Sequence, residues 1–214
     1  MARGKLILIE GLDRTGKTTQ TSILLEKLGG DAELIKFPNR TTKTGQLINT
    51  YLTDSSFSLP DQAIHLLFSA NRWEDAEKIK GLLLEGKHVI LDRYVYSGVA
   101  YSAAKKTPGM DLEWCLQPDK GLIKPDLTLF FMNEQAETSS RGGFGEERYE
   151  TSAFQTQVKN EFLQLMNEIE EPHYRKNHLK VLNVAGKTIE EVSEEVWTIV
   201  SDNIQKDSYD FMYF

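Results

Sequence analysis

The sequence contains a single cysteine, Cys115, among its 214 residues. One cysteine can form neither a disulfide within the chain nor a cysteine-based zinc site, and its isolation suits a reducing compartment. Long apolar runs are lacking as well. The start, MARGKLILIEG, has no apolar segment of signal-peptide length, and no stretch approaches a membrane span. We therefore expect a soluble protein of the cytoplasm, the nucleus or both.

Basic residues are fewer than acidic ones, 25 against 32, which gives a net charge of −7. General nucleic-acid binders usually present a basic face, so neither nucleic acid nor a membrane is the expected partner. A local arginine cluster can still bind a small anion inside an acidic protein. The 40% hydrophobic and 27% charged residues are an ordinary globular balance, and the length predicts one domain spanning residues 1–214.

Short apolar runs are what the chain does have, and helix-like sequence separates them. Because these runs are apolar throughout, they are typical of strands covered on both faces. We expect strands at 5–9, 33–37, 88–92, 127–132 and 179–184. Helices are expected at 17–28 and 59–85, as a short pair within 95–116, and at 148–170 and 188–203. This alternation predicts an α/β fold with a five-stranded parallel sheet and helices on both faces.

One glycine-rich turn follows the first expected strand and opens the first expected helix. Residues 11–18, GLDRTGKT, match the phosphate-loop pattern G-x-x-x-x-G-K-[ST]. In such a loop the backbone N–H groups surround a phosphate, the lysine (Lys17) reaches the terminal phosphates and the hydroxyl (Thr18) binds Mg²⁺. The context favours binding of a nucleoside triphosphate over a chance match. Asp13 and Arg14 are additions that the pattern does not ask for.

The use of that phosphate is open between three classes of protein. A GTPase should show the guanine signature Asn-Lys-x-Asp, which the sequence lacks. An ATPase driven by nucleic acid should carry a basic tract or further domains. A small kinase needs a second anion site, and ligands of such sheets bind beyond the carboxyl ends of the strands. Arg40 and Arg93 follow the second and third expected strands, and the arginine fork suits a phosphate.

A possible nucleobase site lies in the long expected helix. Phe68 and Arg72 are four residues apart and share a helix face, so one could stack on a base while the other hydrogen-bonds to its edge. Taken alone, each has a plainer interpretation. Phe68 could belong to the core, and Arg72 could form a salt bridge at its rim. Either arginine after a strand could likewise be a surface ion pair.

Five further motifs, in order behind the phosphate loop, give the chain a family resemblance. It resembles the thymidylate kinases, most closely the eukaryotic and especially the fungal members, in GLDRTGKTTQ, FPNR, LLFSANRWE, DRYVYSGVAYSAAK, KPDLTLFF and GFGEERYE. The resemblance implies the P-loop NTPase fold of the nucleoside monophosphate kinases. It also implies transfer of the γ-phosphate of ATP to dTMP, with Mg²⁺, by a homodimer.

The resemblance also implies roles for individual residues. The catalytic set would be Arg14, Lys17 and Arg93. The residues expected at ATP are Gly11, Asp13, Arg14, Thr15, Gly16, Lys17, Thr18, Thr19 and Arg141. Those expected at dTMP are Asp13, Phe37, Arg40, Phe68, Arg72, Arg93, Ser97, Gly98, Tyr101 and Tyr149. Thr18 and Asp92 would support Mg²⁺. Asp13 would contact the 3′-hydroxyl, and Tyr101 would pack under the sugar, where a 2′-hydroxyl would collide.

Two positions carry further expectations. Many members of the family have Glu where this chain has Asn39, so we assign Asn39 no metal role. Residues 135–145, QAETSSRGGFG, are polar and follow a strand, and we expect them to form a closing lid or a plain surface loop, the lid spanning about 134–148. Arg141 and Arg148 flank this segment and either contact ATP or are solvated. The remaining alternatives are a monophosphate kinase with another base preference and a non-catalytic nucleotide-binding module.

Overall fold

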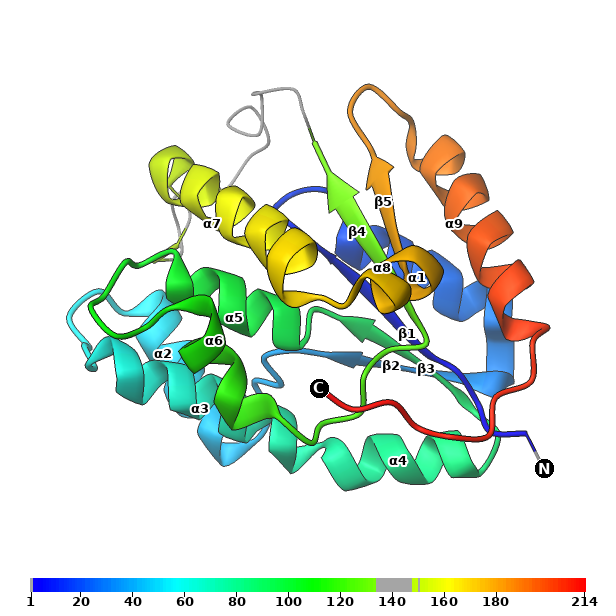
Figure 1. Ribbon diagram of the computed structural model, residues 1–214, viewed down its shortest axis with the longest axis horizontal. Coiled ribbons are helices and arrows are strands. Elements are labelled where there is room, and N and C mark those ends of the chain that lie inside the picture. The colour runs from blue at the N-terminus through cyan, green and yellow to red at the C-terminus, as the bar shows by residue number, and fades with distance from the viewer. Residues whose placement is uncertain (1, 134–147, 150) are drawn as a thin grey trace.

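The computed structural model of the chain describes residues 2–133, 148–149 and 151–214. Its centre is one parallel sheet with strand order β2-β3-β1-β4-β5 (Figure 1). The strands are β1 (Leu6–Gly11), β2 (Ala32–Lys36), β3 (His88–Asp92), β4 (Leu127–Met132) and β5 (Leu179–Asn183). All five expected strands are therefore present, within two residues at each end, and the α/β fold is confirmed.

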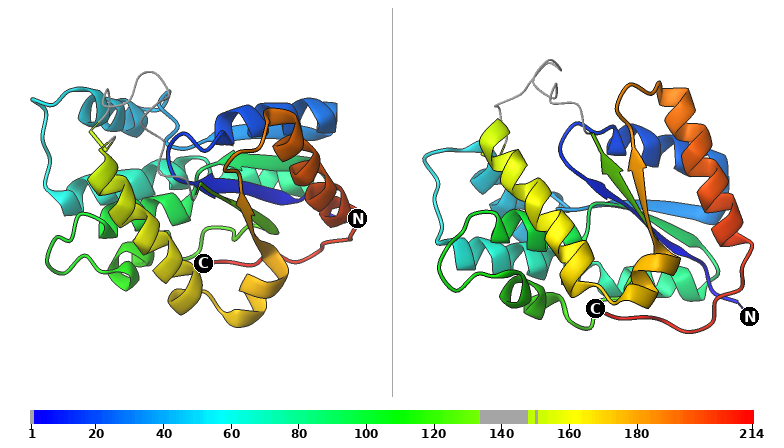
Figure 2. Two further views of the ribbon diagram at one scale, coloured as in Figure 1. Left: turned by 90° about the horizontal axis from the view of Figure 1, so that it is seen from above. Right: turned by 45° about the horizontal axis from the view of Figure 1, so that its top comes forward.

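Nine α-helices of the described residues surround the sheet. They are α1 (Lys17–Leu28), α2 (Lys43–Thr53), α3 (Asp61–Glu74), α4 (Ala76–Leu84), α5 (Val95–Ala103), α6 (Leu112–Leu116), α7 (Ser152–Gln164), α8 (Pro172–His178) and α9 (Ile189–Ile204). Helices α1 and α9 cover one face of the sheet, and α4, α5 and α7 pack on the other, with α6 against α5 (Figure 2). No helix of the described residues has the length and apolar character needed to cross a membrane.

The sheet register brings the candidate site residues to one edge. Ile9 of the central strand β1 pairs with Asp92 of β3, and Gly11 pairs with Phe131 of β4. Gly11 has a φ of 136°, and a Cβ there would lie 2.3 Å from the carbonyl oxygen of Phe131. Only glycine fits where the chain leaves β1 this close to its neighbour. The phosphate loop thus starts beside Asp92, at the carboxyl edge of the sheet.

The expected single helix at 59–85 is wrong, since α3 and α4 are separate. The break lies at Asp75, whose backbone N–H reaches back to Arg72 and Trp73 and whose carboxylate accepts from Asn39 at 2.8 Å. A tertiary contact thus fixes the residue at the bend. The helix begins at Asp61, two residues later than expected, with Pro60 as its N-cap.

Two helices were not predicted from the sequence, and one expected helix begins later than predicted. Helix α2, capped by Thr42, and helix α8 were not expected. The helix expected at 148–170 begins instead at Ser152, where Thr151 accepts from the Phe154 N–H at 3.3 Å. After α7 the chain forms one π-helical turn, η4 (Leu165–Ile169). The spacing of apolar residues alone does not show where α7 begins or where it changes to a π-helical turn.

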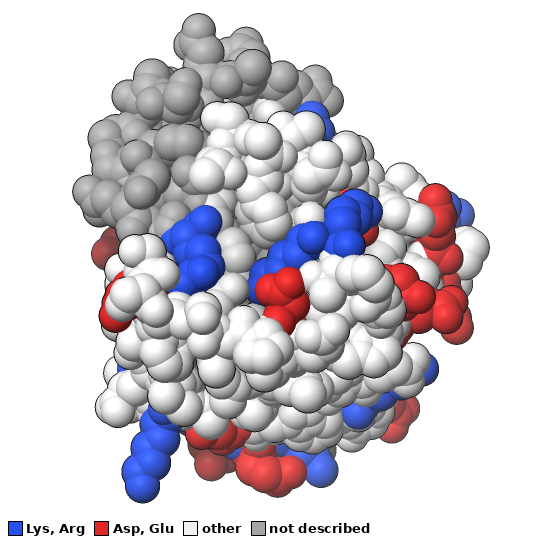
Figure 3. Space-filling model, turned by 90° about the vertical axis from the view of Figure 1, so that its left-hand side faces the viewer, with Lys and Arg blue, Asp and Glu red and all other residues white. Residues whose placement is uncertain are grey.

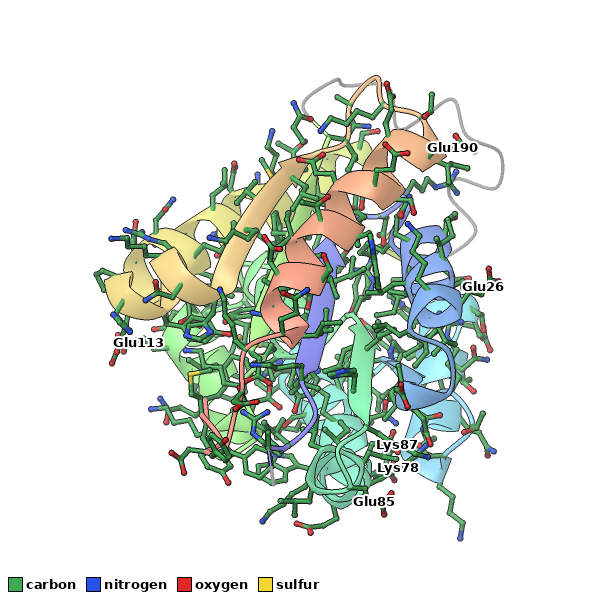
Figure 4. The ribbon with its side chains drawn as sticks, turned by 90° about the vertical axis from the view of Figure 1, so that its right-hand side faces the viewer. Glu26, Lys78, Glu85, Lys87, Glu113 and Glu190 are labelled. Atoms are coloured by element: carbon green, nitrogen blue, oxygen red, sulfur yellow. The ribbon has the colours of Figure 1, made fainter. Side chains whose placement is uncertain are left out.

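Exposed ion pairs form at Glu33 of β2. Lys78 and Lys87 both approach Glu33, at 3.5 and 4.0 Å, and Figure 4 shows these lysines on one side of the molecule, with Glu26 on α1 and Glu190 on α9 above them. Such exposed pairs contribute roughly 0–1 kcal/mol each to stability.

Candidate active site

The phosphate loop joins β1 to α1 in a conformation that its glycines permit. Gly16, the N-cap of α1, has a φ of 87°, and Arg14 also has a positive φ, 64°. Lys17 is buried and donates from Nζ to the carbonyl of Leu12, as the Thr15 hydroxyl also does at 3.0 Å. The loop therefore wraps around its own lysine at the positive end of α1, the arrangement that binds phosphate.

Lys17 is held in an unusual electrostatic state. Burial and the neighbouring Arg93 lower its pKa to about 7, although Asp13, Asp92 and Glu10 act in the opposite direction. A lysine whose pKa lies near neutral pH becomes fully protonated when an anion binds beside it. This property suits a group that meets the terminal phosphates of a nucleotide.

Thr18 and Asp92 form an oxygen pair at the loop. The Thr18 hydroxyl donates to Asp92 Oδ2 at 2.8 Å, and Asp92 is buried at the end of β3. Oxygen donors of this kind are what Mg²⁺ prefers, and it usually takes the rest of its shell from phosphates and water. The pair expected to support Mg²⁺ is thus assembled, and its chemistry fits that ion.

The Asp13 carboxylate is held by two side chains from different segments. Arg93 Nη2 forms an ion pair with Asp13 Oδ1, and Gln155 Nε2 of α7 donates to Oδ2 at 2.7 Å. Gln155 also accepts the backbone N–H of Asp13 at 3.3 Å. Burial alone would raise the pKa of Asp13, but Arg93 and Lys17 outweigh it and the pKa is lowered. Asp13 is therefore a fixed, ionised acceptor, and Gln155 is a partner of Asp13 that no sequence motif revealed.

Arg93 is positioned indirectly, through Ser97, by a buried carboxylate that the sequence analysis missed. Glu10, fully buried in β1, accepts from the N–H groups of Tyr94 and Ser97, both at 2.9 Å, and from the Ser97 hydroxyl at 2.6 Å. Arg93 Nη1 in turn donates to Ser97 Oγ at 3.0 Å. Glu10 so anchors the turn in which Arg93 has a φ of 66°. The signal for Glu10 in the sequence was an acidic residue inside an otherwise apolar strand.

A cavity of about 920 Å³ lies beside the loop and takes in both sets of predicted residues. Figure 3 shows this end of the molecule, with lysine or arginine atoms on either side of a hollow. All ten residues expected at dTMP line the cavity, together with Arg14, Gly16, Lys17, Thr18, Thr19 and Asp92. Gly11 and Thr15 do not line the cavity. Both belong to the phosphate loop, where the Thr15 hydroxyl donates to the carbonyl of Leu12. The fold thus brings together predicted residues from five different segments of the chain.

One end of the cavity combines Phe68 with Arg72. The Arg72 guanidinium donates from Nε and Nη2 to the buried Asp119, at 3.0 and 2.6 Å. A Cβ on Gly98 would lie 2.5 Å from Arg72 Nη1, so only glycine leaves room for the guanidinium. Arg72 therefore does form a salt bridge, as its plainer interpretation has it, but the pair is buried and not at the rim of the core. The ion pair also fixes the arginine in the wall of the cavity, beside the half-buried Phe68 ring.

Aromatic rings form the wall near Asp13. Tyr101 lies edge-on to Phe162 at 6.3 Å, with Tyr149 at 5.9 Å and the Arg93 guanidinium at 5.3 Å from its ring centre. Tyr149 stacks on Phe154 at 5.1 Å. Tyr101 therefore has little freedom to move away from a bound group.

The remaining predicted residues fall in three kinds of place. Arg40 is exposed at the mouth of the cavity and donates to Asn49 at 2.8 Å. Arg148 points at α2 instead, donating to the carbonyls of Tyr51 and Phe57 at 3.0 and 2.6 Å. Arg141 and the segment 135–145 lie outside the described residues.

Comparison with known proteins identifies the family of this chain. The sequence pattern of the thymidylate kinase family matches residues 9–196. This chain belongs to the thymidylate kinase family. It is 47% identical to the thymidylate kinase of Danio rerio, over 94% of this chain and 92% of that one. Identity to the thymidylate kinase of Homo sapiens is 44%, over 95% and 92% of the two chains. Phosphorylation of dTMP is the family function, so the chain is a nucleotide kinase.

Solved thymidylate kinase structures resemble the fold over nearly its whole length. That of Candida albicans, described as having broad substrate specificity, has a TM-score of 0.90 and 47% identity, covering 100% of this chain and 99% of its own. That of Ehrlichia chaffeensis has a TM-score of 0.70 at 23% identity, covering 92% and 99%, and supports the fold alone. The expected P-loop fold of the monophosphate kinases is confirmed.

Proposed function

We propose that this thymidylate kinase transfers the γ-phosphate of ATP to dTMP with Mg²⁺, giving dTDP, as a step of dTTP synthesis. The observation that carries the proposal is the single cavity in which the phosphate loop meets Asp13, Arg93, Phe68 and Arg72. Phosphoryl transfer requires mainly that two anions be aligned and their charge neutralised. The acceptor is already an ionised phosphate, so the proposal needs no general base.

Each substrate has its own part of the cavity in this proposal. ATP lies over the phosphate loop, with Lys17 and Arg14 at the phosphate being transferred. The dTMP phosphate meets Arg93 and Arg40, its 3′-hydroxyl donates to Asp13, and its base lies between Phe68 and Arg72. The ion pair between Asp13 and Arg93 supports this division, because one residue faces a sugar hydroxyl while its partner faces a phosphate.

Thr18 and Asp92 would hold the magnesium ion, Asp92 through water. The ion supplies positive charge to the phosphates when it is bound. The chain's own residues do the remaining work: Lys17, Arg14 and Arg93 neutralise the moving group, while Phe37, Ser97 and Gly98 shape the acceptor side of the cavity. Arg141 and a lid at about 134–148 complete the proposal on the ATP side.

A coupled assay tests the proposal against its alternatives. Purified protein receives ATP, Mg²⁺ and one of dTMP, dUMP, dCMP, AMP or GMP, and ADP release is measured. We expect the highest kcat/KM with dTMP. A higher value with another nucleotide would identify a different monophosphate kinase. ADP release that does not depend on an added acceptor would indicate a simple ATPase. No ADP release with any acceptor would indicate a non-catalytic binding module.

The homodimer and the cytoplasmic or nuclear location belong to the same proposal. Leu47 on α2 and Leu66 on α3 are 48% and 47% exposed on adjoining helices, which would suit an interface between copies. Analytical ultracentrifugation over a range of concentrations measures the dimer, and imaging of a fluorescent fusion locates the protein. A monomer at all concentrations would remove the dimer from the proposal.

A further inference from the structure

A buried histidine stands behind the base end of the cavity, and the reaction as proposed does not use it. His65 lies on α3, is 0% exposed and packs beside Trp114 with ring centres 5.4 Å apart. Its Nδ1 is 2.8 Å from the hydroxyl oxygen of Ser102 on α5. Ser102 lines the cavity one helical turn beyond Gly98, the glycine that makes room for Arg72. The histidine therefore touches a side chain on the cavity wall without reaching the cavity itself.

The protonation of His65 determines what Ser102 presents. Burial and then Arg72 lower the pKa of His65 to about 4, so the ring is neutral at pH 7 and one nitrogen is an acceptor. The Cys115 backbone acts to raise that pKa, as a carbonyl acceptor does. Which group donates in the His65–Ser102 hydrogen bond depends on the ring tautomer, and we take the N–H to be on the ring nitrogen that Ser102 does not use. That nitrogen, Nε2, is buried and has no hydrogen bond of standard geometry with the described residues. Nδ1 is then the acceptor, and the Ser102 hydroxyl donates to it.

We propose that His65 fixes the Ser102 hydroxyl as an acceptor on the cavity wall, and that this acceptor selects bases that carry an N3–H. A hydroxyl whose proton is committed to Nδ1 offers only lone pairs to a ligand. Thymine and uracil have a donor at ring position 3, whereas cytosine has an acceptor there. Two acceptors face to face leave a buried polar group unpaired, which is the costly case.

Arg72 reinforces the same choice at the neighbouring edge position. Asp119 takes its Nε and Nη2, so the nitrogen left for a base edge is Nη1, a donor. A donor there suits the O4 of thymine or uracil and opposes the amino group of cytosine. Arg72 and the His65–Ser102 pair therefore read adjacent atoms of one base. This inference rests on the proposed placement of the base in the cavity.

The test compares the affinities for dUMP and dCMP, which differ only at positions 3 and 4 of the ring. Dissociation constants are measured by calorimetry for the wild-type protein and for Ser102→Ala, Ser102→Thr, His65→Phe and the double variant Ser102→Ala/His65→Phe. Arg72 is present in all of them, so a change in the ratio of the two constants reports on position 3. We expect Ser102→Ala to reduce the preference for dUMP by about tenfold, because the acceptor is removed. Ser102→Thr keeps the hydroxyl and should keep the preference.

His65→Phe distinguishes a positioning role from mere packing. It keeps a ring in the buried site but frees the hydroxyl to rotate, so the preference should fall about as far as in Ser102→Ala. The double variant should then show the same preference for dUMP over dCMP as either single variant. A thermal melt checks folding, and Ser102→Ala alone still decides the matter if His65→Phe does not fold. An unchanged ratio in Ser102→Ala, or independent losses in the double variant, would overturn the inference. A wild-type protein that accepts neither dTMP nor dUMP would instead overturn the proposed function.

Discussion

Asp13 and Gln155 are 142 positions apart in the sequence, and their side chains are joined by a 2.7 Å hydrogen bond. Gln155 holds both the carboxylate and the backbone N–H of Asp13. Through this one residue, helix α7 sets the position of the phosphate loop on the side that faces the proposed acceptor. The relationship links the two substrate regions more directly than the loop motif does.

Replacing Gln155 with Ala should therefore impair the acceptor side more than the donor side. The Asp13 carboxylate loses the hydrogen bond from Gln155, so we expect KM for dTMP to rise about tenfold, equivalent to about 1.4 kcal/mol. KM for ATP should change less than threefold. Steady-state kinetics with each substrate varied in turn measures both constants. An equal rise in the two would mean that Gln155 merely supports the loop as a whole.

Gly98→Ala should remove the base end of the cavity while leaving the fold intact. The added Cβ would lie 2.5 Å from Arg72 Nη1, and the guanidinium is held in place by Asp119. We expect dTMP to bind at least about tenfold more weakly, with ATP binding unchanged. Gly81→Ala on α4 is the matched control, because nothing lies within 4 Å of its Cβ. It should stabilise the protein by about 0.5–1 kcal/mol and leave the kinetics alone. Unaltered dTMP affinity in Gly98→Ala would show that Arg72 is not at the base.

Binding of ATP should be accompanied by proton uptake at pH 8. The pKa of Lys17 is lowered to about 7, so in the free enzyme this lysine is mostly neutral at pH 8. The anionic phosphates favour its charged form and raise the pKa, so a proton is taken up. As pH rises above about 7, the affinity for ATP should fall. Calorimetry in two buffers of different ionisation enthalpy counts the protons.

Lys17→Arg provides the control for that measurement, since arginine stays protonated throughout this range. The uptake assigned to the loop should disappear in this variant, even though its affinity is also reduced. Identical proton uptake in the two proteins would place the titrating group elsewhere.

Tyr101 should govern the choice between deoxyribose and ribose. Phe162, Tyr149 and Arg93 confine its ring, so it cannot yield to an added 2′-hydroxyl. We expect Tyr101→Ala to narrow the preference for dTMP over ribo-TMP about tenfold, measured as the ratio of kcat/KM values. Tyr101→Phe keeps the ring and should keep the ratio. If Tyr101→Ala preserves the preference too, the sugar is read by another group.

Asp92→Asn should raise the magnesium requirement. The amide keeps a hydrogen-bonding oxygen near Thr18, 2.8 Å from the carboxylate in the native protein, but lacks its charge. We expect the Mg²⁺ concentration for half-maximal activity to rise about tenfold or more. A magnesium titration at saturating ATP and dTMP measures it, and Thr18→Ser, which keeps the hydroxyl, serves as the control. An unshifted titration curve would remove Asp92 from the metal site.

Local signals in the sequence predicted much of the site because the site residues follow strands. Lys17 and Thr18 belong to a motif, and Arg93 lies directly after an apolar run. The parallel sheet brings the ends of such runs together. Glu10, Gln155 and Asp119 act as partners of those residues. Gln155 lies on a helix and Asp119 in a connecting segment, where an amide or an acid usually only meets solvent. Glu10 lies inside a strand, and its sequence position does not show which groups it binds.

The sequence by itself determined the alternating α/β architecture, the phosphate loop and the types of residue around it, because hydrophobic periodicity and glycine placement are local properties. Tertiary structure alone decided the bend at Asp75, the pairing of Gln155 with Asp13 and the burial of His65 behind Ser102. Each depends on a partner more than thirty residues away. Such contacts exist only once the sheet has brought distant segments together, so no window of sequence contains them.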